Sequence, residues 1–271
     1  MIVYVYNYYS LKSSKKTINN IIRKLRNIYT SLICIDIINL ESLKLNKVDL
    51  LIVSGGDGTI NKVVNLTINY NLVYSFIPLG NANDICNNLN IKSIDKAIDL
   101  IKSYKQNNKY KYKQIMKVNN NYFLYGLAIG DISKLSIGSK NIYKKMLNKW
   151  FYIFRGIRYL FNKKTYYIKV DNKEEYIKAI TVLIINTTQL GGFSVSKKLY
   201  NDKFKLIYIK NIYDFIKLFI FKNIKYKTFQ NIKIYTNNLC VIDGERLELS
   251  NAMNTKIYEI NNITYARKII N

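Results

Sequence analysis

Residues 49–61 read Asp-Leu-Leu-Ile-Val-Ser-Gly-Gly-Asp-Gly-Thr-Ile-Asn, and this stretch decides the fold. The apolar run 49–53 is typical of a parallel strand buried on both faces. Apolar positions at helical spacing follow over 59–68. A glycine-rich loop between a strand and a helix can bind phosphate through backbone N–H groups and the helix dipole. Asp57 would repel phosphate unless a metal ion lay between them, so it indicates Mg²⁺ held against a nucleotide.

A second loop, 77–84, reads Ile-Pro-Leu-Gly-Asn-Ala-Asn-Asp and contains the single proline of the chain. It ends the next expected strand, 73–77. Ligands of open parallel sheets bind at the carboxyl ends of the strands. We therefore expect Asn83 and Asp84 to lie beside the first loop.

The two loops sit in a regular alternation of strand and helix over the first 115 residues, which predicts a parallel α/β sheet. The expected strands are 2–6, 31–38, 49–53 and 73–77, and the expected helices 16–28, 59–68 and 94–101. Beyond residue 116 the pattern predicts a mainly antiparallel β domain. Its expected strands are 118–129, 165–171, 179–186, 203–209, 231–236 and 238–243, with helical insertions at 141–161 and 213–221.

The insertion 141–161 carries aromatic and apolar residues on one helical stripe with basic residues around it. Such a helix could lie on an anionic membrane. The alternative, which we favour, is a helix packed on its own β domain. The same alternatives hold for 213–221.

Together, the two loops resemble the catalytic domain of the diacylglycerol kinase family, in its bacterial soluble lipid kinase branch. A third segment, Ile242-Asp243-Gly244-Glu245, is similar to the family's late D-G-E motif. The resemblance extends over nearly the whole chain through weaker matches at Asn7 and Ser10, Tyr122-Phe123 with Gly126 and Gly130, and Asn186 with Gly191-Gly192.

This resemblance implies a Rossmann-like α/β nucleotide domain over 1–116 and a β-sandwich lipid-substrate domain over 117–250. It places the active site in the cleft between them and lets the tail, 251–271, return to the first domain. The implied reaction transfers the γ-phosphate of ATP to a lipid hydroxyl, diacylglycerol-like, at a membrane surface.

The resemblance also assigns roles to individual residues. Nucleotide contacts are expected from Asn7, Ser10, Gly55, Gly56, Asp57, Gly58, Thr59, Asn61, Gly80, Asn81, Asn83 and Asp84. The catalytic residues are expected to be Asp57, Asp243 and Glu245. Asp57 and Asp84 are expected to organise Mg²⁺ through water, and Glu245 to act as the general base with Asp243 nearer the metal. Residues two apart on a strand point the same way, so we expect Asp243 and Glu245 side by side.

The sequence departs from the family pattern at several positions. Lys62 stands in place of Glu, Asn81 in place of Thr, and Gln114 in place of an Asp of the metal-linked carboxylate network. Asp202 matches the family's structural Mg²⁺ loop, but Lys203 and Lys205 bring positive charge there. The main loops and D-G-E remain, which favours an active but divergent kinase.

Composition narrows the chemistry further. The 271 residues include no His, which excludes Ser-His-Asp and Cys-His nucleophile systems, H-E-x-x-H zinc sites and His-ligated haem. A general acid or base must then be a carboxylate, Lys, Tyr or Cys. Three dispersed cysteines fit a reducing cytoplasm, and no apolar run approaches the length of a membrane span.

The net charge of +26 indicates an anionic partner, such as ATP or an anionic membrane surface, with which the protein would associate peripherally. The lysines are spread along the chain, so a specific nucleic-acid site is not expected. Two other interpretations stay open: an NAD kinase, which shares the G-G-D-G-T motif, and a catalytically silent nucleotide-binding or membrane-associated relative. The lipid acted on and a homo-oligomeric state also stay open.

Overall fold

The computed structural model describes residues 1–43, 45–130, 164–171, 173–190, 193–195, 204–222, 225–238, 240–247 and 256–270. The chain forms two compact units, residues 1–115 with 265–271 and residues 116–264. It passes from one unit to the other within two strands, β5 (Lys111–Val118) and β17 (Lys256–Ile269). The assignment of these units to nucleotide and lipid stays a prediction.

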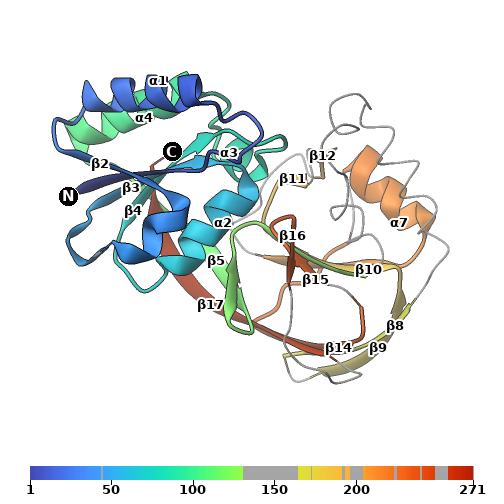
Figure 1. Cartoon of the computed structure of the whole chain (residues 1–271). Helices are drawn as coiled ribbons and strands as arrows, with labels where there is room; N and C mark the ends of the chain where they lie inside the picture. The colour runs from blue at the N-terminus through green and yellow to red at the C-terminus, as the bar shows by residue number, and fades with distance from the viewer. Residues whose placement is uncertain are drawn as a thin grey trace. The chain divides into compact units, whose positions relative to one another are not determined.

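The first unit is built on a parallel sheet in the order β2-β1-β3-β4 (Figure 1). Its strands are β1 (Ile2–Tyr6), β2 (Leu32–Asp36), β3 (Leu50–Gly55) and β4 (Val73–Pro78). Every residue of β3 and β4 is buried, as expected for central parallel strands. At the far end of the chain, the last residues of β17 extend this sheet, where Lys268 pairs with Val73 and Ile269 with Tyr74.

Helices cover both faces of that sheet: α1 and α4 lie together on one face, and α2 lies on the other (Figure 1). Their bounds are α1 (Lys15–Arg26), α2 (Asp57–Leu66), α3 (Asp84–Asn88) and α4 (Ile94–Asn107), with 3-10 turns η1 (Ile37–Ser42) and η2 (Leu45–Lys47). Ser14 and Ser93 begin α1 and α4 as N-caps, since each hydroxyl accepts the N–H group three residues on.

The second unit contains two antiparallel sheets. In one, β17 pairs with β14 (Asn231–Thr236), β14 with β8 (Lys164–Val170), and β8 with β9 (Lys173–Ala179). The other has the order β13-β10-β7-β15-β16. Its strands are β7 (Gly126–Gly130), β10 (Thr181–Ile185), β13 (Lys205–Ile209), β15 (Cys240–Ile242) and β16 (Glu245–Leu247).

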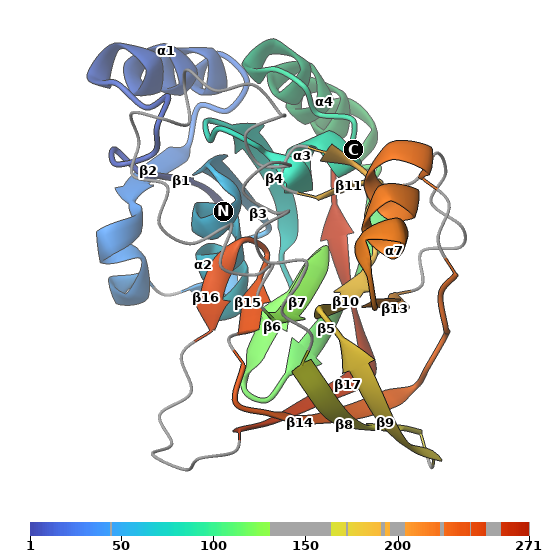
Figure 2. The same cartoon turned by 90° about the vertical axis from the view of Figure 1, so that its right-hand side faces the viewer.

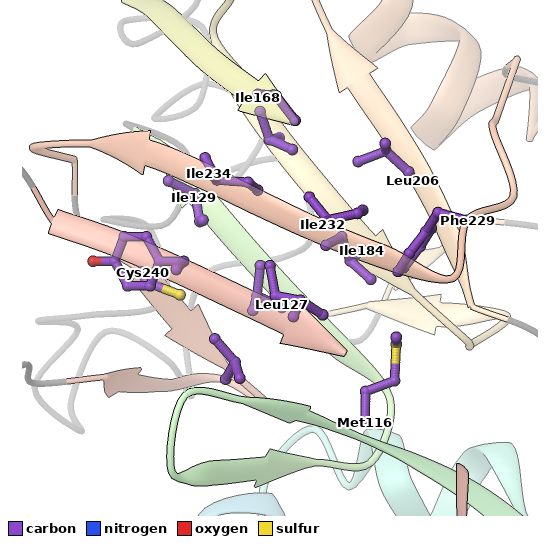
Figure 3. Packing of buried hydrophobic residues seen from close by; sticks show 14 of the residues in the cluster. Met116, Leu127, Ile129, Ile168, Ile184, Leu206, Phe229, Ile232, Ile234 and Cys240 are labelled. Atoms are coloured by element: carbon purple, nitrogen blue, oxygen red, sulfur yellow. The ribbon is translucent and has the colours of Figure 1, made fainter. Parts of the chain in front are cut away.

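A shared hydrophobic core joins the two sheets of this unit. Ile168, Ile232 and Ile234 from the first sheet cluster with Leu127 and Ile184 from the second (Figure 3). Alternate residues of each strand enter this cluster, which is the packing of a β-sandwich.

The other face of the second sheet carries a separate cluster. There, α7 (Ile212–Ile216) lies against β13 (Figure 2), and the π-helical turn η4 (Lys217–Phe221) follows it. Phe215 and Leu218 of this segment pack with Leu183 and Ile207 of the sheet. Two short strands, β11 (Gln189–Leu190) and β12 (Phe193–Ser194), form a separate hairpin, and β6 (Asn121–Phe123) pairs with β5.

The predicted fold class is confirmed, because a parallel α/β core precedes an antiparallel β region. The expected single strand 118–129 is wrong: a left-handed Asn119 begins a two-residue turn, so that β5, β6 and β7 replace it. Short α3 and strands β9 and β17 were not predicted. The predicted insertion 141–161, Gly191-Gly192, Asp202 and residues 251–255 of the tail lie outside the described residues.

In the part of the chain that the structure describes, no helix has both the length and the apolar character needed to span a bilayer.

Candidate functional site

Three loops of the first unit follow the carboxyl ends of β1, β3 and β4, which are neighbours in the sheet. The sheet order reverses between β1 and β3, since β2 lies on one side of that pair and β4 on the other. Ligands of doubly wound sheets bind at such a switch point. The fold therefore places the three predicted nucleotide loops at the edge where a ligand is expected.

The loop after β3 opens α2, whose N-cap is Gly56. A glycine N-cap has no side chain to satisfy the first N–H groups of the helix, so an external anion can take that place. Thr59 in the first turn and Gly58 before it are half-buried. Just before the loop, a buried hydrogen bond of 2.7 Å between the hydroxyls of Tyr4 and Ser54 joins β1 to the end of β3.

The loop after β4 packs directly against this first loop. A Cβ atom at Gly80 would lie 2.5 Å from the Cα of Gly56, so the two backbones meet at a distance that excludes any side chain. Just before this contact, the Leu79 N–H donates to the Gly55 carbonyl at 2.9 Å. The glycines at 56 and 80 are therefore required by the approach of one loop to the other.

Asp57 ties the two loops together through its side chain. Its carboxylate accepts the backbone N–H groups of Asp84 (3.1 Å) and Ile85 (2.9 Å), the first two residues of α3. The short α3 thus begins on a cap supplied by another loop, 27 residues earlier in the sequence. The carboxylate of Asp57 faces the positive end of that turn, and Asp84 is fully buried.

Asn83 shapes the turn between Gly80 and α3. It adopts the left-handed conformation, with φ of 51° and ψ of 42°. Its side chain accepts the Gly80 N–H at 2.8 Å and donates to the Gly80 carbonyl at 3.0 Å. Asparagine is one of the few residues that tolerate this conformation and supply both bonds. Asn81 is exposed at the tip of the same turn.

The loop after β1 reaches the first loop through Thr59. Asn7 donates from its Nδ2 to the Thr59 hydroxyl at 2.9 Å, and the Ser10 hydroxyl lies 3.4 Å from that oxygen. The Lys12 N–H donates to the Leu79 carbonyl at 3.0 Å. The structure therefore brings together predicted site residues from all three loops.

Asn61 occupies a different position from the others. It is buried inside α2, where its side-chain and backbone oxygens both accept from Asn65 Nδ2, at 3.1 and 2.9 Å. Its neighbour Lys62, which replaces the family's Glu, is exposed. Asn61 is held as part of the helix, one turn beyond the loop. Gln114, half-buried, lies on β5.

In the second unit, the D-G-E segment departs from the expected geometry. Asp243 and Gly244 are the two central residues of the turn that joins β15 to β16, with φ of 47° and 86°. Both values are positive, as in the hairpin turns that favour an Asp-Gly pair. The expectation that Asp243 and Glu245 lie side by side along one strand is wrong, because Asp243 is in the turn and Glu245 pairs with Ile242.

The buried Asp243 carboxylate is engaged with backbone. It accepts N–H groups from Leu124 (2.6 Å), Tyr125 (2.9 Å) and Gly126 (3.1 Å), while the Asp243 N–H donates to the Gly126 carbonyl (2.8 Å). Three N–H groups directed at one carboxylate stabilise its ionised form. Glu245, by contrast, is exposed at the start of β16. The two carboxylates therefore have different surroundings.

Among the described residues, no group of three or more Cys, Asp or Glu side chains could hold a metal ion without help. Mg²⁺ usually keeps several waters and takes one or two carboxylates with substrate phosphates. Asp57 and Asp84, which are joined by the hydrogen bond from the Asp84 backbone N–H to the Asp57 carboxylate, supply the number of carboxylates that this mode needs. The predicted structural site at Asp202 lies outside the described residues.

Sequence reasoning missed the supporting contacts of the site. The Asp57 cap of α3, the Tyr4–Ser54 bond and the Asn83–Gly80 pair all depend on tertiary placement. Cys86, in α3, is buried near this site, and burial, followed by the nearby charge of Asp57, raises the pKa of its thiol. The left-handed conformation of Asn83 could have been predicted from the sequence, because Asn is favoured where a turn needs a positive φ.

Comparison with solved structures shows which class of protein has this fold. A diacylglycerol kinase from Bacillus anthracis superposes with a TM-score of 0.74 over 99% of this chain and 96% of that one, at 21% identity. An NAD kinase from Archaeoglobus fulgidus, solved in complex with ATP, superposes less closely, with a TM-score of 0.55 at 14% identity over 100% of this chain and 94% of that one. The chain thus has the two-domain fold of diacylglycerol kinases.

Comparison of sequences gives the family. Residues 5–113 match the family model of the diacylglycerol kinase catalytic domain, so this segment belongs to that family. A Staphylococcus carnosus protein named "Putative lipid kinase" is 29% identical over 77% of this chain and 69% of its own length. For a Staphylococcus aureus relative the match, at 30% identity, covers 54% of this chain and 48% of the relative. The resemblance predicted from the motifs is confirmed.

Proposed function

We propose that this protein is an ATP- and Mg²⁺-dependent lipid kinase, which transfers the γ-phosphate to a diacylglycerol-like hydroxyl at a membrane surface. The observation that carries the proposal is the junction of the two glycine loops. Gly56 packs against Gly80, and Asp57 caps the turn that begins at Asp84. A glycine-capped helix and two aspartates linked at a switch point suit a nucleoside triphosphate with its metal.

In this proposal the first unit binds and orients ATP. The N–H groups at the start of α2 receive phosphate oxygens, while Asn7, Ser10 and Thr59 form the wall that the three loops share. Asp57 and Asp84 would hold Mg²⁺ through water. When bound, this ion neutralises the charge that develops on the phosphate oxygens. The protein's own contribution is to keep these groups in place before the nucleotide arrives.

The second unit supplies the base in this account. Glu245 takes the proton of the lipid hydroxyl, the freed oxygen attacks the γ-phosphorus, and ADP leaves. An exposed carboxylate is accessible to a substrate, as Glu245 is. Asp243 has a different role here from the one expected from its motif. Its three backbone hydrogen bonds fix the turn from which Glu245 starts, so it positions the base.

The proposed setting is the cytoplasm, with the protein peripherally associated with an anionic membrane during turnover. The net charge of +26 supports association with such a surface and with ATP. The substrate lipid is identified by incubating the protein with ATP, Mg²⁺ and a panel of hydroxyl-bearing lipids, and reading the mass of each product. We expect one lipid class to gain a phosphate and the gain to vanish when Mg²⁺ is chelated. If no lipid gains mass, the proposed activity is wrong.

A further inference from the structure

The segment formed by α7 and η4 exposes large apolar side chains on the protein surface. Four of them define what we name the apolar ridge: Ile212, Tyr213, Ile220 and Phe221, which are 45%, 59%, 55% and 62% exposed. They fall within ten consecutive residues. Scattered apolar side chains on a surface are ordinary, whereas a group of this size on one short helical segment calls for a partner.

The ridge is not the face by which the segment packs on its own unit. Phe215 and Leu218 do that, since they are buried, at 7% and 1% exposure, in the cluster on the outer face of the sheet. Within α7, Tyr213 lies two residues before Phe215 and therefore points to the opposite side of the helix. In the turn that follows, Ile220 and Phe221 are more than half exposed, whereas Leu218 is buried. The segment thus anchors through one apolar face and presents a second one outward.

The charges around the ridge select the partner. Residues 210–227 contain five lysines and one acidic residue, Asp214. The carboxylate of Asp214 accepts the backbone N–H of Lys210 at 2.9 Å, so it is engaged within the segment. Lys217 lies over the ring of Tyr213, with its Nζ 4.4 Å from the ring centroid, and Lys222 ends η4. One of the five lysines, Lys227, pairs with Glu175 at 2.6 Å. Apolar side chains in a segment with this excess of lysine suit an anionic bilayer, in which rings and chains enter the headgroup region while lysines meet lipid phosphates.

We infer that the apolar ridge is the element by which this protein docks on an anionic lipid bilayer. The inference rests on the proposed lipid-kinase function, since an enzyme whose substrate stays in a membrane needs a surface that holds the enzyme at that membrane. It does not depend on catalysis for its test, because docking is measured without nucleotide.

The experiment is cosedimentation of the full chain with vesicles of phosphatidylcholine and phosphatidylglycerol. Ile220→Ser and Phe221→Ser each remove an exposed side chain from the ridge. Ile38→Ser, at a residue that is 67% exposed on η1 of the first unit, is the matched control. We expect each ridge variant to lower the vesicle partition coefficient roughly tenfold, the effect of withdrawing one large apolar side chain from the interface. The control should bind as wild type does, and all should melt at the same temperature.

Two results would overturn the inference. One is wild-type partitioning of both ridge variants. The other is a change from dimer to monomer in solution with partitioning unchanged, which would make the ridge a contact between two copies. The kinase proposal has its own test, the phosphorylation of a monomeric short-chain diacylglycerol, which should persist in the ridge variants. If the wild-type protein does not phosphorylate this substrate but still binds vesicles, the kinase proposal is wrong and the docking surface stands.

Discussion

At the scale of single residues, a substitution of Asp57 tests both its structural role as a cap and its proposed role as a metal ligand. Its carboxylate caps α3 through two N–H groups and is proposed to hold Mg²⁺ with Asp84. In Asp57→Asn the side-chain amide would direct N–H groups toward backbone N–H groups. We expect a loss of about 1–3 kcal/mol of unfolding free energy and a fall in turnover of roughly a hundredfold or more, measured by urea denaturation and by kinase assay.

The matched control is Asp95→Asn. Asp95 also lies in the first turn of a helix, α4, but it is exposed and pairs with Lys24 at 2.5 Å, and this pair holds the pKa of its carboxyl below the usual value. An exposed pair contributes little to stability. Equal turnover losses in the two variants would show that Asp57 has no special place in the site.

Asp243 and Glu245 form a second test at this scale. Asp243→Asn leaves three buried N–H groups around a side chain that can accept from fewer of them, so we expect a loss of about 2–4 kcal/mol of stability. Glu245→Gln, at an exposed position, should leave stability unchanged and abolish most turnover. The measurements are urea denaturation and kinase assay on the same preparations. A stable but inactive Asp243→Asn variant would return Asp243 to the catalytic group.

Gly80 tests the contact between the loops. A methyl group there would lie 2.5 Å from the Gly56 Cα and 2.8 Å from the Asn83 Oδ1, so the loops must separate. We expect Gly80→Ala to cost about 1–3 kcal/mol of stability and to weaken ATP binding measured by calorimetry. Gly56→Ala, where the nearest atom would be 3.2 Å away, should cost less. The reverse order would contradict the packing described.

The sequence predicted which residues gather at the site better than it predicted how they are held. Gly55 to Thr59 and Gly80 to Asp84 meet as expected because both loops follow neighbouring parallel strands, a consequence of pattern alone. The geometry of Asp243 could not be obtained in the same way. An Asp-Gly pair is compatible with a strand end or with a hairpin turn, and the bonds to residues 124–126 that fix the turn come from far away in the sequence.

At the scale of elements, the packing of α3 at the site can be measured through the reactivity of its cysteine. Cys86 lies in this turn and is fully buried, as is Cys240 in β15, whereas Cys34 on the edge strand β2 is half-buried. Burial raises the pKa of the Cys86 and Cys240 thiols, so the reactive thiolate is scarcer at neutral pH than in a free cysteine. We expect a thiol reagent at pH 8 to label one of the three cysteines, Cys34, in the native protein.

The control for that labelling is Cys34→Ser, which should remove the fast phase. Rapid labelling of Cys86 in the wild-type protein would mean that α3 opens readily, and the account of a preformed junction between the loops would be wrong. Labelling of all three thiols in denaturant confirms that the reagent can reach them.

Among the elements themselves, runs with a clear local pattern were predicted, and elements that depend on tertiary contacts were not. β1 and β14 have the bounds that the pattern predicted, since each is a short β-rich run between polar turns. The five-residue α3 was missed because its cap comes from Asp57. β17 was missed as a strand although the return of the tail was expected, since its pairing with β4 and β14 joins segments remote in sequence.

At the scale of the whole molecule, the net charge of +26 agrees with a protein that binds anionic partners. The two proposals account for part of this charge through anionic partners: a bilayer at the ridge and ATP at the glycine loops. The kinase proposal joins these partners in one reaction.

The most direct test of that claim is a competition for labelled phosphate in one vessel. The protein is given ATP labelled in its γ-phosphate, Mg²⁺, diacylglycerol in anionic vesicles and NAD, and the products are separated after a short incubation. The account predicts label in the phosphorylated lipid, none in NADP, and loss of the lipid label in Glu245→Gln. Label in NADP, or in neither product, would contradict it.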